Sequence, residues 1–163
     1  MNALPPEPVT ADDWIQQLQL EPHPEGGHYR RLFTAPETVI TPRGERPTMT
    51  AIHYLLRDGE HSAFHRLHSH ELWHWHTGTA LHIHCLEPDG SYRCRRLGPG
   101  GDMTLAIPPR HWFAAELAGV GDYALVTCTV TPGFDFADFE WGHREPLAQD
   151  YPGHRDLIHR LGQ

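Results

Sequence analysis

Residues 59–78 read GEHSAFHRLHSHELWHWHTG, and this stretch sets the expectation for the whole chain. It gathers histidines, the carboxylate of Glu71 and two tryptophans, a mixture that neither an ordinary core nor a solvated surface requires. Imidazole and carboxylate groups bind metal ions or exchange protons near neutral pH. We therefore expect the chemistry of the protein in this stretch.

The spacing within the stretch resembles the first signature of the cupins, G-x5-H-x-H-x3-E-x6-G. Gly59, His65, Glu71 and Gly78 hold matching positions, and Leu67 stands where the second histidine belongs. In a metal-binding cupin the two histidines and the glutamate are ligands that point into a small β-barrel. The resemblance implies that His65 and Glu71 point inward and that one ligand of the usual set is missing.

The second cupin signature, G-x5-P-x-G-x2-H-x3-N, is matched only in part. Pro108 holds the proline position, Arg110 replaces the glycine, and Phe113 replaces the third ligand histidine. Two of the four usual ligands are thus apolar, so a standard site of three histidines and one glutamate is not expected.

A substitute metal site remains open. A divalent transition metal needs three or more converging donors. His65 and Glu71 would have to be joined by His82, His84 or His111.

Four segments in order resemble one cupin family catalogued as a domain of unknown function. They are PEGGHYRR at 24–31, SAFHRLHSHELWHWHTGTAL at 62–81, LEPDGS at 86–91 and VTCTVTPGFDFADFE at 126–140. The resemblance implies a homodimeric jelly-roll barrel with an open pocket of polar and aromatic side chains, similar in shape to deoxysugar-nucleotide epimerases. It implies a fold better than it implies a reaction.

Short apolar or alternating runs separated by glycine, proline and acidic turns predict an all-β barrel. The expected strands cover 28–33, 49–56, 62–67, 71–76, 81–86, 92–97, 103–107, 111–116 and 123–130. Thr10 can cap a short N-terminal helix that ends near Pro22, and residues 154–161 can form a short C-terminal helix. We expect one cupin domain over 1–163, with 1–9 as a loose lead-in.

Composition narrows the class of partner. A formal charge of −8 disfavours binding to nucleic acid and to anionic membrane surfaces, and no run of apolar residues is long enough to span a membrane.

Three cysteines at irregular spacing predict reduced thiols in a cytoplasmic protein. Residues 134–141 alternate phenylalanine with acids, which suits either a dimer interface or a cover over the barrel. We expect a small-molecule ligand and a homodimer.

Strand alternation assigns further side chains to the pocket. If Glu71 points inward, Trp73 and Trp75 do so as well. A two-residue hairpin at Gly78 and Thr79 would place His82 and His84 on the inner face, although a loop one residue longer or shorter would turn them to solvent. His111 shares a strand face with Phe113. Tyr29, Tyr54 and Trp112 are expected to complete the walls.

We predict that the pocket binds a small polar or carbohydrate-like molecule. Its most favoured activity is acid/base chemistry of the epimerase or isomerase type, with His65 as base and Glu71 as its tuning partner. Two alternatives stay open: a metal-dependent oxygenase or lyase, and a binding module without turnover.

Overall fold

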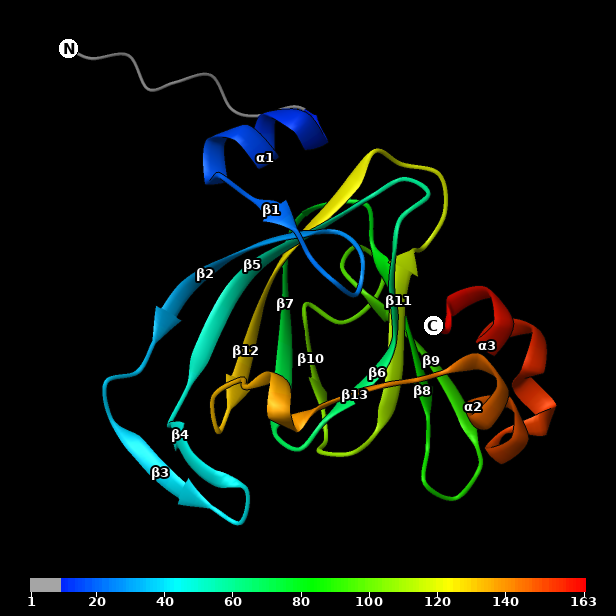
Figure 1. Cartoon of the computed structure of the whole chain (residues 1–163). Coiled ribbons are helices and arrows are strands. Elements are labelled where there is room, and N and C mark those ends of the chain that lie inside the picture. Colours follow the sequence, from blue (N-terminus) through cyan, green and yellow to red (C-terminus); the bar gives the residue numbers. More distant parts are fainter. Residues whose placement is uncertain (1–9) are drawn as a thin grey trace.

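Two antiparallel sheets carry most of the chain in the computed structural model, which describes residues 10–163 (Figure 1). The predicted lead-in over 1–9 lies outside the described residues. The first sheet has the order β1 (Glu21–Pro22), β2 (His28–Thr34), β5 (Thr50–Arg57), β12 (Tyr123–Thr131), β7 (His70–Gly78) and β10 (Thr104–Ile107). The second has the order β13 (Phe139–Trp141), β6 (His61–Leu67), β11 (Trp112–Leu117), β8 (Leu81–Leu86) and β9 (Tyr92–Leu97).

The sheets face each other as a jelly-roll sandwich and bury one apolar core between them. Trp73 and Tyr54 of the first sheet pack in this core with Phe113 and Ile83 of the second. The predicted all-β jelly-roll architecture is therefore confirmed, and all nine predicted strands are present with small shifts at their ends. The barrel is not closed by one continuous hydrogen-bonded ladder, because the two sheets pair separately.

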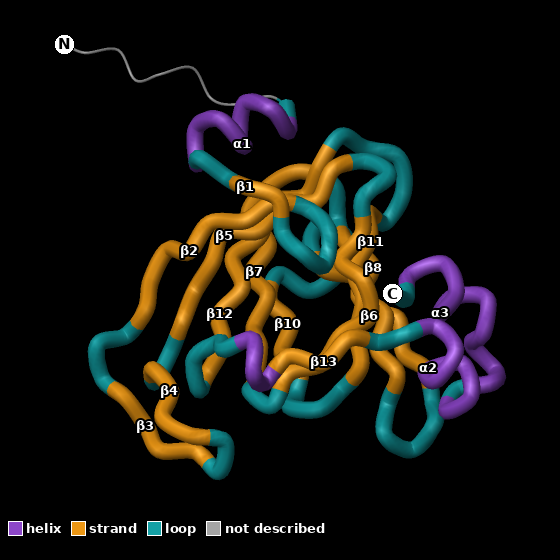
Figure 2. Tube along the Cα trace, viewed as in Figure 1, coloured by secondary structure: helices purple, strands orange, loops and turns teal. Residues whose placement is uncertain are grey.

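A short hairpin, β3 (Thr38–Thr41) with β4 (Gly44–Pro47), was not predicted. Figure 2 shows it projecting beyond the end of β2 as an arm. Arg46 of this arm is tied back to the body through Asp138, which accepts hydrogen bonds from Arg46 Nε at 2.8 Å and Nη2 at 3.0 Å.

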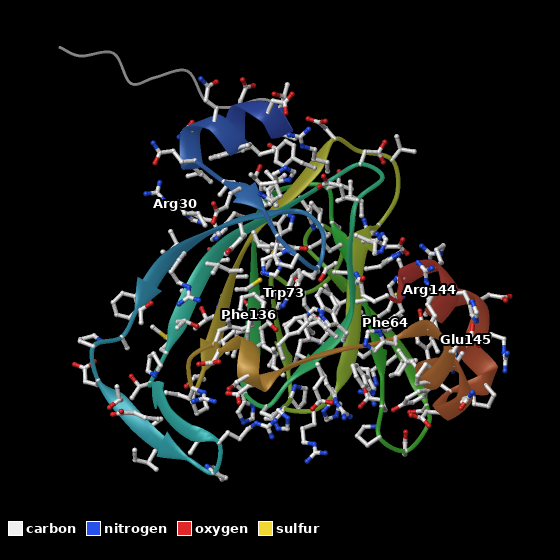
Figure 3. The ribbon with its side chains drawn as sticks, in the orientation of Figure 1. Arg30, Phe64, Trp73, Phe136, Arg144 and Glu145 are labelled. Carbon is white, nitrogen blue, oxygen red and sulfur yellow. The ribbon has the colours of Figure 1, made fainter. Side chains whose placement is uncertain are left out.

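The helices lie outside the sandwich. Helix α1 (Ala11–Leu18) begins with the predicted cap, since the Asp13 amide donates to Thr10 Oγ1 at 3.2 Å. Helix α3 (Arg155–Leu161) confirms the C-terminal prediction, and α2 (Arg144–Asp150) precedes it unpredicted. These two helices cover the outer face of the second sheet, where Leu147 and Ile158 pack on Phe64 (Figures 1 and 3).

The segment from Phe134 to Trp141 covers one end of the sandwich within the chain. It forms a short 3-10 helix, η1 (Phe136–Asp138), followed by β13, which pairs with β6. The cover that we weighed against a dimer interface is thus present, and it supplies one wall of the cavity described next.

Candidate functional site

A cavity of about 60 Å³ opens between the two sheets beneath this cover. Its polar lining includes His23, Glu25, Tyr29, Arg31, His65 and Glu71. Phe134, Phe136 and Phe139 form an aromatic wall, in which Phe136 (labelled in Figure 3) is the exposed member. The space is enough for a few waters or for part of a small polar molecule.

Glu25 enters the cavity from the loop before β2. Its carboxylate is buried and accepts a hydrogen bond from Ser62 Oγ at 2.9 Å. The loop is held by Gly26, whose φ of +109° leaves the backbone pressed against β6, so that a Cβ there would lie 2.0 Å from the carbonyl oxygen of His61. Only glycine allows this approach, and the approach sets the depth of Glu25.

His65 lies between two aromatic rings on β6. Its imidazole stacks on Phe139 with ring centroids 5.1 Å apart and contacts Phe113 at 4.2 Å. Because a carbonyl oxygen can only accept, Nδ1 donates to the Ala63 carbonyl at 2.7 Å. The Nε2 atom then faces Glu25 Oε2 at 3.4 Å. Both groups at this contact are acceptors when Nδ1 carries the imidazole proton, so the pair can take up one proton between them.

Glu71 is a second carboxyl group in the same cavity. Burial, with a smaller contribution from the negative charge of Glu25, raises the pKa of Glu71 to about 8, while the nearby Trp73 indole and Cys128 thiol oppose the rise. Its Oε2 atom is buried and has no hydrogen-bond partner among the described residues. At neutral pH this group is therefore largely a neutral acid with a proton to donate.

His23 completes the polar cluster from the loop that also carries Glu25. Its Nδ1 accepts the backbone N–H of Glu25 at 3.1 Å, which leaves the proton on Nε2. Burial lowers the pKa of His23 more than the charge of Glu25 raises it, and the nearby His65 lowers it further. The neutral imidazole is the favoured form.

The structure corrects the predicted partner of His65. Glu71 and His65 both line the cavity, but among residues 10–163 no hydrogen bond or ion pair joins them. The carboxylate beside His65 is that of Glu25, because the loop before β2 folds over β6 and inserts it there.

Of the aromatic residues assigned to the pocket, Tyr29 lines the cavity. Tyr54 is fully buried behind it and donates from its hydroxyl to the Gly26 carbonyl at 2.6 Å. Trp73 lies in the core against Tyr54 and Phe113 (Figure 3), and the partly buried Trp75 packs against the same core. Both tryptophans point inward as expected, but neither lines the cavity.

The expected inward position of His82 and His84 is wrong. Leu81, Ile83 and Cys85 are the residues of β8 that enter the core, so the two histidines between them lie on the outer face. The physical reason is that β7 and β8 do not form a hairpin: the chain crosses from one sheet to the other between Gly78 and Leu81. The inward or outward direction of a side chain on β7 therefore cannot be used to assign the direction of side chains on β8, because residues of the two strands are not paired with each other.

Trp112 and His111 also lie outside the cavity. Trp112 packs with the core under α2 and α3, and the guanidinium of Arg66 sits 4.3 Å from its ring centroid. The Nε2 atom of His111 lies 3.2 Å from Glu87 Oε2 at the far end of β8. The substitute shell left open by the sequence, with His82, His84 or His111 joining His65 and Glu71, does not form among residues 10–163.

A cupin-type metal does not fit the donors of this cavity. Leu67 lines it and Phe113 packs against His65, and neither side chain offers a lone pair. In residues 10–163 the three-donor group with ligand atoms within 4.8 Å of one another lies elsewhere, on β8 and β9. The described donors of the cavity therefore do not converge on a common point as ligands of one metal ion would.

Sequence reasoning missed Glu25, His23 and Arg31 as cavity residues. Glu25 and Arg31 lie within PEGGHYRR at 24–31, a segment from which only Tyr29 is predicted to line the pocket. A carboxylate directly before two glycines that allow close approach of the backbone is a detectable pattern.

Two solved structures are similar to the chain along nearly its whole length. A hypothetical protein from Leishmania major is 33% identical, with a TM-score of 0.89, 94% of this chain covered and 99% of that chain. A protein from Shewanella oneidensis is 36% identical, with a TM-score of 0.87, 95% of this chain covered and 98% of that chain. No curated protein matches the sequence.

A third likeness concerns the fold alone. Oxalate decarboxylase from Bacillus subtilis has a TM-score of 0.56 at 15% identity, with 86% of this chain covered but only 36% of that chain. Residues 12–142 match the family described as Cupin superfamily (DUF985). Together with the fold, this match shows that the chain belongs to that cupin family.

Proposed function

We propose that the protein binds a small polar molecule in the cavity between its sheets and transfers protons to and from it, as an isomerase or epimerase does. The observation that carries the proposal is the enclosure in one cavity of a His65–Glu25 pair and a protonated Glu71. Acid and base groups with separated proton affinities are what proton transfer at a carbon next to a carbonyl requires.

Each group has a role in this proposal. The His65–Glu25 pair accepts the proton from carbon, because Nδ1 of His65 is held by the Ala63 carbonyl and the lone pair of Nε2 and the Glu25 carboxylate meet in the cavity. Glu71 donates its proton to the carbonyl oxygen of the substrate, which gives an enol. The pair then returns its proton to the other face of the same carbon or to the adjacent carbon, and Glu71 takes a proton back from the enol oxygen as the carbonyl group re-forms, which completes epimerisation or isomerisation.

The lining also favours a class of substrate. The guanidinium of Arg31 can pair with a carboxylate or phosphate at the cavity wall, and the phenylalanine wall can pack on the C–H face of a sugar ring. We therefore favour an anionic, carbohydrate-like carbonyl compound. Arg31 itself is exposed and donates to Thr34 Oγ1 at 3.1 Å, so it can reach a ligand from the surface.

Solvent deuterium exchange tests this function without a known substrate. Sugar phosphates, uronic acids and 2-oxo acids would be incubated with the protein in D₂O and followed by proton NMR. Exchange at a carbon next to a carbonyl is expected for at least one compound, and it should be lost in His65→Ala and Glu71→Gln. His70→Ala, an exposed change on β7, is the matched control.

If a compound binds stoichiometrically but none of its protons exchange, the protein is a binding module and not an enzyme of this type. Equal exchange in wild type and His65→Ala would remove the base from the proposal.

We further propose that the protein acts as a homodimer in a reducing, cytoplasmic environment. The arm and its base expose apolar side chains, among them Ile40 at 78% and Phe33 at 45% exposure, which a second copy could cover. All three cysteines are free. None of the described helices has the length and apolar character needed to cross a membrane. Light scattering at micromolar concentration should give a dimer mass, and a monomer mass would exclude it.

A further inference from the structure

A second cluster of chemically active side chains lies on the outer face of the second sheet, away from the cavity. His82 and His84 alternate on β8, and Cys94 lies directly opposite His84 on β9. Side chains that face each other across an antiparallel pair lie close together on the same face. The neighbours Ile83 and Cys85 point to the core, so this cluster is separated from the cavity by the sheet itself.

The donor atoms of this cluster converge. One ligand atom from each of His82, His84 and Cys94 lies within 4.8 Å of the other two, and the group is the sole one of its kind in residues 10–163. In a tetrahedral zinc site, bonds of about 2.0–2.3 Å place ligand atoms somewhat closer than this. Small side-chain rotations are sufficient to close the difference, because Cys94 is exposed and His82 is half-buried.

The surroundings of His84 already orient it as a ligand. Its Nε2 lies 3.0 Å from Glu116 Oε1, and a carboxylate can only accept, so Nε2 carries the proton. Nδ1 then keeps its lone pair, which accepts the hydroxyl of Tyr92 at 2.8 Å. Glu116 is itself fixed by two hydrogen bonds from Arg160 of α3. A histidine whose second nitrogen donates to a carboxylate is the usual arrangement around protein-bound metals.

We propose that His82, His84 and Cys94 form a binding site for a zinc-class divalent metal ion on the outer face of β8 and β9. Two imidazoles and one thiolate are donors that suit Zn²⁺, and three protein ligands leave one position for water or an external ligand. When the metal binds, Cys94 releases its thiol proton. The Tyr92 hydroxyl turns away from Nδ1 of His84, whose lone pair then coordinates the metal. The site is independent of the proposed function in the cavity.

The reactivity of Cys94 gives a direct test, because the other two cysteines are buried. Tag-free protein, stripped with a chelator, would be labelled with a thiol reagent with and without Zn²⁺. Zinc should slow the labelling of Cys94 strongly, and Co²⁺ in place of zinc should give the near-ultraviolet absorption of a cobalt–thiolate bond.

Variants assign the ligands and the supporting carboxylate. Cys94→Ser should remove the cobalt–thiolate absorption, and His82→Ala should weaken zinc protection. Glu116→Gln should lower zinc affinity by about ten- to hundredfold, because it no longer orients His84 as a charged acceptor. These changes are at exposed or half-buried positions, so folding, checked by circular dichroism, should survive even if His84→Ala does not fold.

Two matched controls should leave the metal signals unchanged. Cys85→Ala removes a thiol from the same strand but from its inner face, and His70→Ala removes an exposed histidine of the other sheet. Zinc that failed to slow Cys94 labelling would overturn the site. So would a cobalt–thiolate band of wild-type strength in Cys94→Ser, or zinc protection of Cys94 that is equal in wild type and His82→Ala. Proton exchange in the cavity should not depend on zinc, which separates this test from that of the proposed function.

Discussion

Glu25 Oε2 lies 3.4 Å from Nε2 of His65, although the two residues come from a loop before β2 and from the middle of β6. This contact joins two of the four segments that carry the family resemblance, 24–31 and 62–81, into one site. It also places a negative charge near Glu71, whose carboxyl is raised in pKa by burial first and by Glu25 second.

Glu71 should make the stability of the protein depend on pH. Its folded pKa of about 8 lies above the ordinary value of 4.5, so its contribution to stability is full below about pH 4.5, falls as the pH rises, and is gone above about pH 8. The total is on the order of a few kcal/mol. Urea unfolding from about pH 5 to pH 9 should show wild type losing stability relative to Glu71→Gln. Parallel pH profiles in the two proteins would contradict the raised pKa.

Removal of the charge on Glu25 should shift the titration of Glu71. In Glu25→Gln the midpoint of Glu71 should move down toward its ordinary value but remain raised, because burial is the larger cause. Carbon-13 NMR of labelled glutamate carboxyls would follow both proteins. Glu37→Gln, an exposed change, serves as the control. An unchanged midpoint in Glu25→Gln would mean that the two carboxyl groups do not interact.

Gly26 should be far less tolerant of a side chain than Gly59. Both have positive φ, +109° and +79°, but a Cβ at Gly26 would meet the His61 carbonyl at 2.0 Å, whereas nothing lies within 4 Å at Gly59. We expect Gly26→Ala to cost roughly 1–3 kcal/mol more than Gly59→Ala, because the loop must shift. It should also displace Glu25 and lower proton exchange in the cavity. If the two variants lost the same free energy of unfolding, the loop at Gly26 would be able to move away from the His61 carbonyl at little cost.

The strands could be predicted from the sequence because each one alternates on its own. Ile83 and Leu81 enter the core while His82 and His84 do not, as period-two alternation requires. Alternation within a strand does not show which strands pair with each other or which sheet each strand belongs to. The chain leaves one sheet after Gly78 and enters the other at Leu81, and no local pattern distinguishes this crossing from a hairpin.

The site was predictable only where the sequence pattern and the cavity coincide. His65 and Glu71 line the cavity because their strands run beside it, as the cupin spacing implies. Glu25 reaches the same cavity from a loop, through a backbone approach that depends on the positive φ of Gly26. Loop geometry of this kind follows from long-range packing, so the partner of His65 could not be derived from strand alternation.

The last prediction concerns the attachment of the arm to the cavity cover. Asp138 is buried in η1, next to Phe139 of the aromatic wall, and it accepts hydrogen bonds from Arg46 and from Arg43 Nε at 2.9 Å. The hydrogen bond from Arg46, together with the charges of the two arginines, lowers the pKa of Asp138 below its ordinary 3.8. A lowered pKa gives stability that is present above the unfolded value and lost as the pH falls through the folded value.

Asp138→Asn should therefore be less stable than wild type at neutral pH, and this gap should close only below about pH 4. Urea unfolding across that range measures the gap, with the exposed change Asp58→Asn as control. A gap that stayed constant into strong acid would mean that the loss comes from packing and not from the paired charge.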